Sequence, residues 1–280
     1  MSVPGIPLLI VGHWAVSVSV CAGTAAAGLL YLGTTTRVRN WPVQRTLAFL
    51  LGLVVLFIAL DSGLERYDDT LLSVHMTQHL LLIDLAPPLL LCGRPALLAL
   101  RSLPKRPRRG LGRGLVRLGR LTPAPVCLSL YVLLVLVWHL PALFTAAIRD
   151  PVLHELEHAS FLLAGLALWW PLLGNHNWSR RLDGMAQLPY LVIAMAPMVL
   201  IGVYLDTATS LLYPIYSHPA QLAGVSALAD QHQAGGIMWV VGTTFMTWTG
   251  LASIRSALLH AERRQQERDR AAGLLGGLPR

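Results

Sequence analysis

Long apolar segments alternate with short polar connections along almost the whole chain. A helix that crosses a bilayer needs about 20 mostly apolar residues, and seven segments meet this requirement. Their expected ranges are 11–32, 43–61, 71–91, 124–147, 153–173, 186–205 and 234–254. The pattern therefore predicts an all-α fold, a polytopic transmembrane helix bundle over residues 1–258, followed by a charged tail at 259–280.

Two features at segment ends add detail to this prediction. Ala86-Pro87-Pro88 should kink or stop the third segment, because proline lacks the amide hydrogen that a helix uses. The chain after Arg255 is charged, and we expect it to fray into solvent. The sequence shows neither an internal repeat nor a soluble domain.

The composition supports a membrane protein. Of the 280 residues, 54% are hydrophobic and 13% are charged, against about 25% charged residues in soluble domains. The mean hydropathy is +0.56. Cys21, Cys92 and Cys127 show no CxxC spacing, so they predict neither a disulfide framework nor a cysteine metal motif. No basic region precedes the first apolar stretch, so we expect that stretch to be retained as a helix rather than cleaved as a signal peptide.

The basic residues predict an orientation. The formal net charge of +8 could indicate either nucleic-acid binding or a topology signal. Of the 22 Lys and Arg residues, 20 follow the odd-numbered segments. The positive-inside rule then places the N-terminus outside and the C-terminus in the cytoplasm. Since no nucleic-acid-binding motif accompanies these charges, we expect the bilayer, and no nucleic acid, as a partner.

Histidines gather at the predicted outer side. Eight of the ten are expected there. His75 and His79 are four residues apart on the third segment, and His154 and His158 repeat that spacing on the fifth. Each pair presents two imidazoles on one helical face, and His139 is expected about two turns below the outer end of the fourth segment. Neutral imidazole is the commonest protein metal ligand, so these five residues predict a metal site.

The ligand types favour copper. Imidazole suits zinc, copper, iron and nickel, whereas thioether selects Cu(I). Met195 and Met198 on the outer half of the sixth segment are possible secondary ligands, although packing is the commoner role of such methionines. No cysteine lies near the histidines, which disfavours structural zinc. Asp84 is expected on the opposite helical face from His75 and deeper than the pair, as a hydrogen-bonding group or part of an ion path.

Two other readings use the same residues. His154-Glu155-Leu156-Glu157-His158 matches the HExxH pattern of zinc proteases, in which Glu155 would activate water. Leu182-Asp183-Gly184 resembles the third-ligand motif of intramembrane metalloproteases. The predicted topology places Asp183 at the inner side, nearly 40 Å from His158 along the helix axis. A haem held by histidines of facing helices is the other alternative, but it does not need two close pairs.

Several motifs occur together in a fixed order along the chain. They are His75-Met76-x-Gln78-His79 with Ala86-Pro87-Pro88-Leu89-Leu90, Trp138-His139-Leu140-Pro141, Leu153-His154-x-x-Glu157-His158 with Trp169-Trp170-Pro171, and Asp230-Gln231 with Gly235-Gly236 and Met238-Trp239. This combination resembles the CtaG family of bacterial cytochrome c oxidase assembly factors. The likeness extends from the third segment to the seventh and is least distinctive in the first two.

The resemblance implies a multi-pass protein of the bacterial plasma membrane. It implies a non-enzymatic role in assembling a haem–copper oxidase of the caa type, with copper delivered to an oxidase subunit, and it would admit an extracytoplasmic copper chaperone as a partner. The motif histidines correspond to His75, His79, His139, His154 and His158. His232 and Asp84 are additions to the family pattern and possible secondary ligands. A membrane metalloenzyme and a scaffold without metal stay open as alternatives.

Overall fold

The computed structural model describes residues 14, 17–174, 182, 184–222 and 224–276. Within these ranges six helical runs are long and apolar enough to cross a membrane, and a bent pair of helices supplies a seventh if it is counted as one span. Every regular element of the described chain is a helix. The all-α polytopic bundle expected from the sequence is confirmed, and the orientation of its termini remains a prediction.

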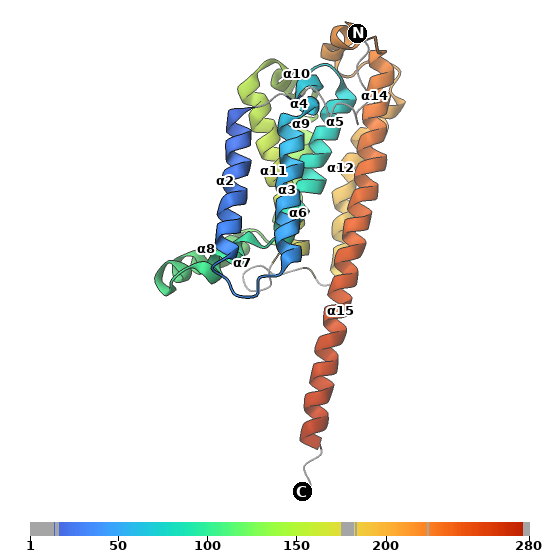
Figure 1. Cartoon of the computed structure of the whole chain (residues 1–280). Helices are drawn as coiled ribbons and strands as arrows, with labels where there is room; N and C mark the ends of the chain where they lie inside the picture. Colours follow the sequence, from blue (N-terminus) through green and yellow to red (C-terminus); the bar gives the residue numbers. More distant parts are fainter. Residues whose placement is uncertain (1–13, 15–16, 175–181, 183, 223, 277–280) are drawn as a thin grey trace.

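The helices follow one another as a bundle with short connections (Figure 1). In chain order they are α2 (Val18–Thr35), α3 (Val43–Asp61), α4 (Gly63–Tyr67), α5 (Leu72–Leu80), the π-helical segment η1 (Leu81–Leu85), α6 (Ala86–Cys92), α7 (Pro95–Ser102), α8 (Lys105–Leu121), α9 (Ala124–Trp138), α10 (Pro141–Arg149), α11 (Pro151–Leu173), η2 (Gly184–Ala186), α12 (Gln187–Thr207), η3 (Pro214–Tyr216), α13 (Ser217–Leu222), α14 (Ala227–Gly236), the π-helical segment η4 (Ile237–Gly242) and α15 (Thr243–Gly276).

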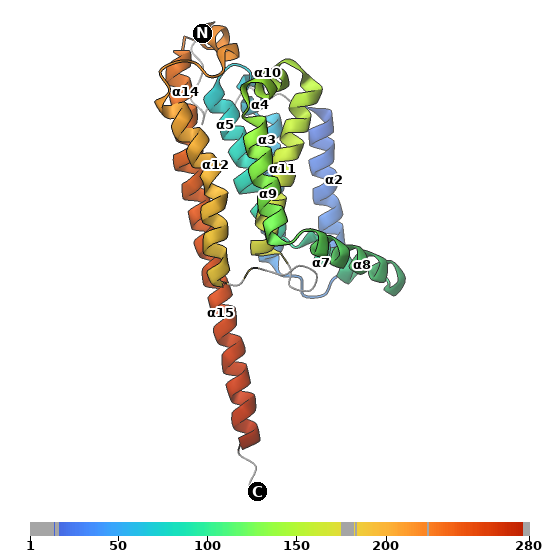
Figure 2. The same cartoon turned by 180° about the vertical axis from the view of Figure 1, so that it is seen from behind.

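The two ends of the bundle differ. Helices α4 and α10 and the start of α5 lie at one end, and α7 and α8 lie at the other (Figures 1 and 2); we call these the α10 end and the α8 end. Helix α8 bends away from α9 by 70°, contains no buried residue and separates arginines from leucines around its axis. This geometry suits an amphipathic helix that lies in the plane of a membrane interface.

Prolines do not stop the third span. The π-helical segment η1 precedes Pro87 and Pro88, and the amide of Ala86 donates to the carbonyl of Leu81. Pro87 has no amide hydrogen for the carbonyl of Ile83. The indole of Trp169 on α11 donates to that carbonyl instead, at 3.1 Å. The expected kink or stop is therefore replaced by a local π-helical turn, and the helix continues to Cys92.

Helix α11 approaches this turn closely because Gly165 faces it. A methyl group built at Gly165 would lie 2.5 Å from the carbonyl oxygen of Ile83 and 2.7 Å from the ring of Pro87. Gly165 and Trp169 are one helical turn apart, so the close approach and the indole hydrogen bond share one face of α11. Together they fix how α11 is placed along α5, η1 and α6.

The fourth span is shorter than the predicted range 124–147. Helix α9 ends at Trp138, and α10 begins separately at Pro141. Leu140 has an extended backbone, with ψ of 126°, because a residue before proline is disfavoured in helical conformation. The break leaves His139 as the residue that caps α9 rather than as part of a continuous helix.

The last helical run is longer than predicted. Helices α14, η4 and α15 continue one another from Ala227 to Gly276, and α15 extends alone beyond the α8 end (Figures 1 and 2). The expectation that the chain after Arg255 frays is wrong for the described residues, because Glu262-Arg263-Arg264 and the residues after them favour a solvated helix.

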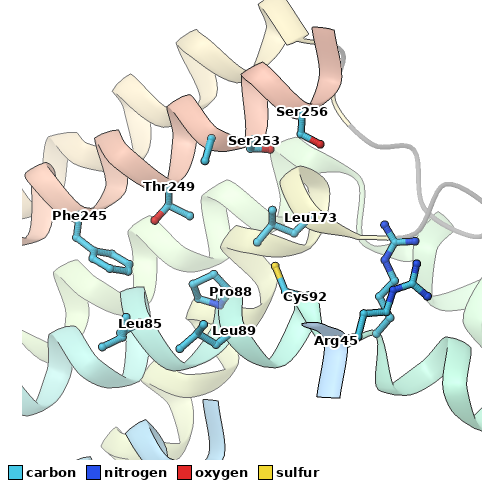
Figure 3. A pocket seen from close by; sticks show the side chains of 12 residues that line it. Arg45, Leu85, Pro88, Leu89, Cys92, Leu173, Phe245, Thr249, Ser253 and Ser256 are labelled. Carbon is cyan, nitrogen blue, oxygen red and sulfur yellow. The ribbon is translucent and has the colours of Figure 1, made fainter. Parts of the chain in front are cut away.

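A cavity of about 570 Å³ lies between α6 and α15 toward the α8 end. Leu85, Pro88 and Phe245 give it apolar walls, and Arg45 lies at one edge (Figure 3). None of the residues that line it belongs to the predicted metal site, so the histidines must be sought elsewhere.

Two adjacent glycines of α14 give a matched test of helix packing. A methyl group at Gly235 would collide with the backbone of α12, lying 2.5 Å from the amide nitrogen of Asp206, whereas one at Gly236 meets nothing within 4 Å. We expect Gly235→Ala to destabilise the protein by about 1–3 kcal/mol. Gly236→Ala should be neutral or stabilising by up to about 1 kcal/mol, since alanine is the better helix former. Unfolding of both variants in detergent checks this, and equal stabilities would contradict the packing.

Candidate metal centre

The two predicted histidine pairs face each other at the α10 end. The ring centroids of His75 and His79 on α5 are 4.2 Å apart, as are those of His154 and His158 on α11. Across the helices, His75 lies 5.4 Å from His154, and His79 lies 5.7 Å from His158. His139 lies 6.3 Å from His79. The structure therefore brings the five sequence-predicted histidines into one cluster.

Two carboxylates complete the cluster. Glu157 on α11 places its oxygens 3.9 Å from Nε2 of His75 and 3.7 Å from Nε2 of His79. Asp68, between α4 and α5, lies 3.3 Å from Nε2 of His154. The donor atoms form two groups whose members all lie within 4.8 Å of one another: His75, His79 and Glu157 in one, and Asp68, His154 and His158 in the other.

Glu157 and Asp68 are not among the ligands predicted from the sequence. Glu157 could have been found, because residues 154, 157 and 158 are spaced i, i+3 and i+4 and share a helical face. Glu155, the glutamate of the HExxH pattern, is exposed and belongs to neither group of donors among the described residues. Asp68 carries no such signal, since it lies in a turn and is brought to His154 by tertiary packing.

The cluster is buried, and ten of its nitrogen and oxygen atoms have no hydrogen-bond partner among the described residues. His75 and Glu157 are fully buried, and His79 is 3% exposed. Among the described residues, both ring nitrogens of His75 and His79 and both carboxylate oxygens of Glu157 accept or donate no hydrogen bond, nor do Nε2 of His139, His154 and His158 and Oδ2 of Asp68. Buried polar groups are ordinarily hydrogen-bonded, and each exception needs a reason.

The geometry fits a metal ion. Two ligands bound to one ion at about 2.1 Å lie roughly 3–4 Å from each other, and the separations of Glu157 from the two imidazoles fall in that range. The distances from Glu157 to the two imidazoles are too long for good hydrogen bonds. A buried carboxylate beside neutral imidazoles therefore lacks compensation that a cation would supply. Burial likewise raises the pKa of Asp68 well above its usual range, with the nearby carboxylate of Glu65 adding to the effect.

One histidine has a defined tautomer. Nδ1 of His139 lies 2.7 Å from the carbonyl oxygen of Val135, and a carbonyl can only accept. Nδ1 therefore carries the hydrogen, which leaves the lone pair of Nε2 free for a metal ion. The backbone carbonyl of His139 accepts from the hydroxyl of Tyr213 at 2.8 Å, so both the ring and the backbone of this residue are held.

The start of α5 is fixed from a distant helix. The carboxylate of Asp230 on α14 accepts from the amide of Leu72 at 2.7 Å and from the hydroxyl of Ser73 at 2.5 Å. Helix N-termini have unsatisfied amides, and a carboxylate from another helix here does the work of a capping residue. The hydroxyl of Tyr216 donates to the carbonyl of Asp68 at 2.8 Å, which holds the turn that leads into α5.

Four further candidates lie outside the two donor groups of the described residues. Met198 is part of the hydrophobic core and Met195 packs against it. Nε2 of His232 lies 2.9 Å from the carbonyl oxygen of Ala208. Asp84 is buried in η1 and faces η4, where a methyl group at Gly242 would lie 3.7 Å from its Oδ2. Asp183 lies outside the described residues.

These features define a polytopic helical membrane protein with a buried histidine–carboxylate cluster at one end of the bundle. The profile of the cytochrome c oxidase caa3 assembly factor family, Caa3_CtaG, matches residues 29–258. The chain belongs to this family, and the resemblance seen in the sequence motifs is confirmed.

Curated relatives extend beyond this chain. An uncharacterized protein of Mycobacterium leprae is 30% identical over 242 residues, which are 81% of this chain and 36% of the relative. An uncharacterized protein of Mycobacterium bovis is 31% identical over 214 residues, which are 72% of this chain and 32% of the relative. The chain thus spans about a third of the length of these proteins. No solved structure matches it.

The support of α5 by Asp230 is testable. We expect Asp230→Ala to lower the free energy of unfolding by about 1–2 kcal/mol, as the loss of a helix cap does, and to weaken metal binding roughly tenfold, because it loosens the helix that carries His75 and His79. Gln233→Ala, on the exposed face of the same helix, is the control. Unfolding in detergent and copper titration measure both effects, and a variant indistinguishable from Gln233→Ala would contradict this role.

Proposed function

We propose that this protein binds copper at the histidine–carboxylate cluster and delivers it to a subunit of a haem–copper cytochrome c oxidase during assembly. The family supplies the process, oxidase assembly. The cluster indicates which ion is carried, because imidazole nitrogens are suitable ligands for copper. On this proposal the protein lies in the bacterial plasma membrane with the α10 end outside, and an extracytoplasmic chaperone brings the copper.

The observation that carries the proposal is the set of buried donor atoms without partners. Seven side chains contribute to it, from α5, α11, the end of α9 and the turn before α5. A scaffold that used its histidines only for hydrogen bonding would pair these nitrogens with carbonyls or hydroxyls, as His139 and His232 do with one nitrogen each. Nε2 of all five histidines of the cluster, and Nδ1 of His75 and His79, are not paired in this way, which favours a metal-binding role.

The surroundings suit storage and exchange of a weakly hydrated ion. Phe144 lies 5.1 Å from His75, and Phe161 lies 4.3 Å from His79, so apolar rings enclose the donors. His154 is 16% exposed and is the most accessible of the five histidines. Ligand exchange through His154 would let copper move between this site and an oxidase subunit without a catalysed reaction.

The metalloprotease alternative has less support. The HExxH reading needs Glu155 to hold the attacking water at the metal, but Glu155 is exposed whereas Glu157 is buried between the histidines. A non-enzymatic role in assembly agrees with this arrangement.

Removing one histidine pair tests copper binding. We expect the His75→Ala/His79→Ala variant, purified after loading with Cu(I), to retain at most about half of the copper of the wild type, because both imidazoles of one donor group are lost. His218→Ala, on the exposed side of α13, should keep it. Metal analysis and oxidase activity in cells that lack the chromosomal gene give the readouts. Equal and low copper in all three proteins would reject the proposal.

Glu155→Gln separates a carrier from a protease. A carrier keeps its copper and supports oxidase assembly within about twofold of the wild type, because Glu155 faces away from the donors. A protease of the HExxH type would lose several orders of magnitude of activity with its general base. Oxidase activity and copper content of membranes from complemented cells are the measurement. Loss of oxidase with normal copper content would favour the enzyme.

A further inference from the structure

The cluster contains more donors than one ion can use. The group formed by His75, His79 and Glu157 and the group formed by Asp68, His154 and His158 have no member in common. Each has two imidazoles and one carboxylate, and His139 adds a further nitrogen. Four ligands complete a tetrahedral ion, so seven donors exceed the needs of a single site.

The two groups differ in exposure at one residue. Both α5 and α11 begin at the α10 end (Figure 1), and His154 is one turn closer to that end than His158 on the same helix. His75, His79 and Glu157 are 0%, 3% and 0% exposed, whereas the side chain of His154 is 16% exposed. Asp68 and His158 are 4% and 5% exposed. Because it contains the partly exposed His154, we call the group with Asp68 the outer group and the group with Glu157 the inner group.

The number of buried carboxylates indicates how many cations the cluster binds. Each group holds one carboxylate, and within the described residues no lysine or arginine forms an ion pair with Asp68 or Glu157. A net charge buried in an apolar bundle is costly. With one monovalent cation, the second carboxyl would have to take up a proton to stay neutral, and it would then no longer be an anionic ligand. Two monovalent cations, one per group, would make the cluster neutral.

We propose that the cluster holds two metal ions side by side, one in the inner group and one in the outer group, with Cu(I) as the ion that satisfies both the charge and the imidazole donors. This inference rests on the proposed function and adds to it the number and places of the ions. His75 of the inner group and His154 of the outer group stack with centroids 5.4 Å apart and an interplanar angle of 14°, which places the two ions as neighbours.

Two matched pairs of carboxylates test the inference. Asp68 is buried and belongs to the outer group, whereas Asp69 beside it is exposed. Glu157 is buried and belongs to the inner group, whereas Glu155 is exposed. The full-length protein and the variants Asp68→Asn, Asp69→Asn, Glu157→Gln and Glu155→Gln are purified in detergent, saturated anaerobically with Cu(I), freed of excess ion, and analysed for copper per chain.

We expect two copper ions per chain in the wild type, Asp69→Asn and Glu155→Gln, and one in Asp68→Asn and in Glu157→Gln. The ion retained by each single variant also shows that the rest of the centre is folded. One ion in the wild type would overturn the two-ion inference and leave copper binding intact. No ion in the wild type would overturn the proposed function itself. Two ions in both buried-carboxylate variants would overturn the assignment of one carboxylate to each ion.

Discussion

The axial register between α11 and the run α5–η1–α6 is the constraint on which the cluster depends. It is fixed where Gly165 meets the backbone of Ile83 and Trp169 donates to the same carbonyl. With a rise of 1.5 Å per residue, His79 lies about 6 Å and His75 about 12 Å above that contact on one helix. On the other helix His158 lies about 10 Å and His154 about 16 Å above it. A slip of one helical turn would separate the pairs, so packing near the middle of the bundle determines the geometry at its end.

Side chains replace the missing hydrogen bonds of backbone groups in the bundle, but the side chains of the cluster have no such replacement. The carbonyl of Ile83, which loses a donor to Pro87, receives the indole of Trp169. The amides at the start of α5 receive the carboxylate of Asp230. Within the described residues, Asp84, Tyr131 and Gln187 also have buried polar atoms without a partner, but ten of the unpaired atoms belong to the imidazoles and carboxylates of the cluster. The free energy that they cost, about 1–3 kcal/mol for each unsatisfied buried group, is a reason to assign them a ligand rather than a role in stability.

Much of this architecture is encoded locally, and the rest is not. Apolar run length predicts the spans, and the i, i+4 spacing of histidines predicts that each pair shares a face. The length of the apolar runs does not predict two of the helix ends, because these depend on proline. Pro141 ends α9 at Trp138, whereas the π-helical turn η1 accommodates Pro87 and the helix continues. Helical spacing places Glu157 on the face of His154 and His158, although the HExxH pattern favours Glu155 instead. Asp68 was not readable, because only the packing of a turn, held by Tyr216, brings it to His154.

The same arrangement limits where a partner can approach under the proposed function. Every donor but His154 is less than 9% exposed, and rings of Phe144 and Phe161 cover the inner histidines. Since His154 is the one partly exposed donor of the two groups, an ion in the inner group has its shortest way out through the outer group. Separation of the helices would instead break the contact of Gly165 with η1, on which the core packing depends. Passage through the outer group needs only exchange among imidazoles already 4–6 Å apart, so the oxidase subunit that receives copper is expected to dock at the α10 end, beside His154 and Asp68.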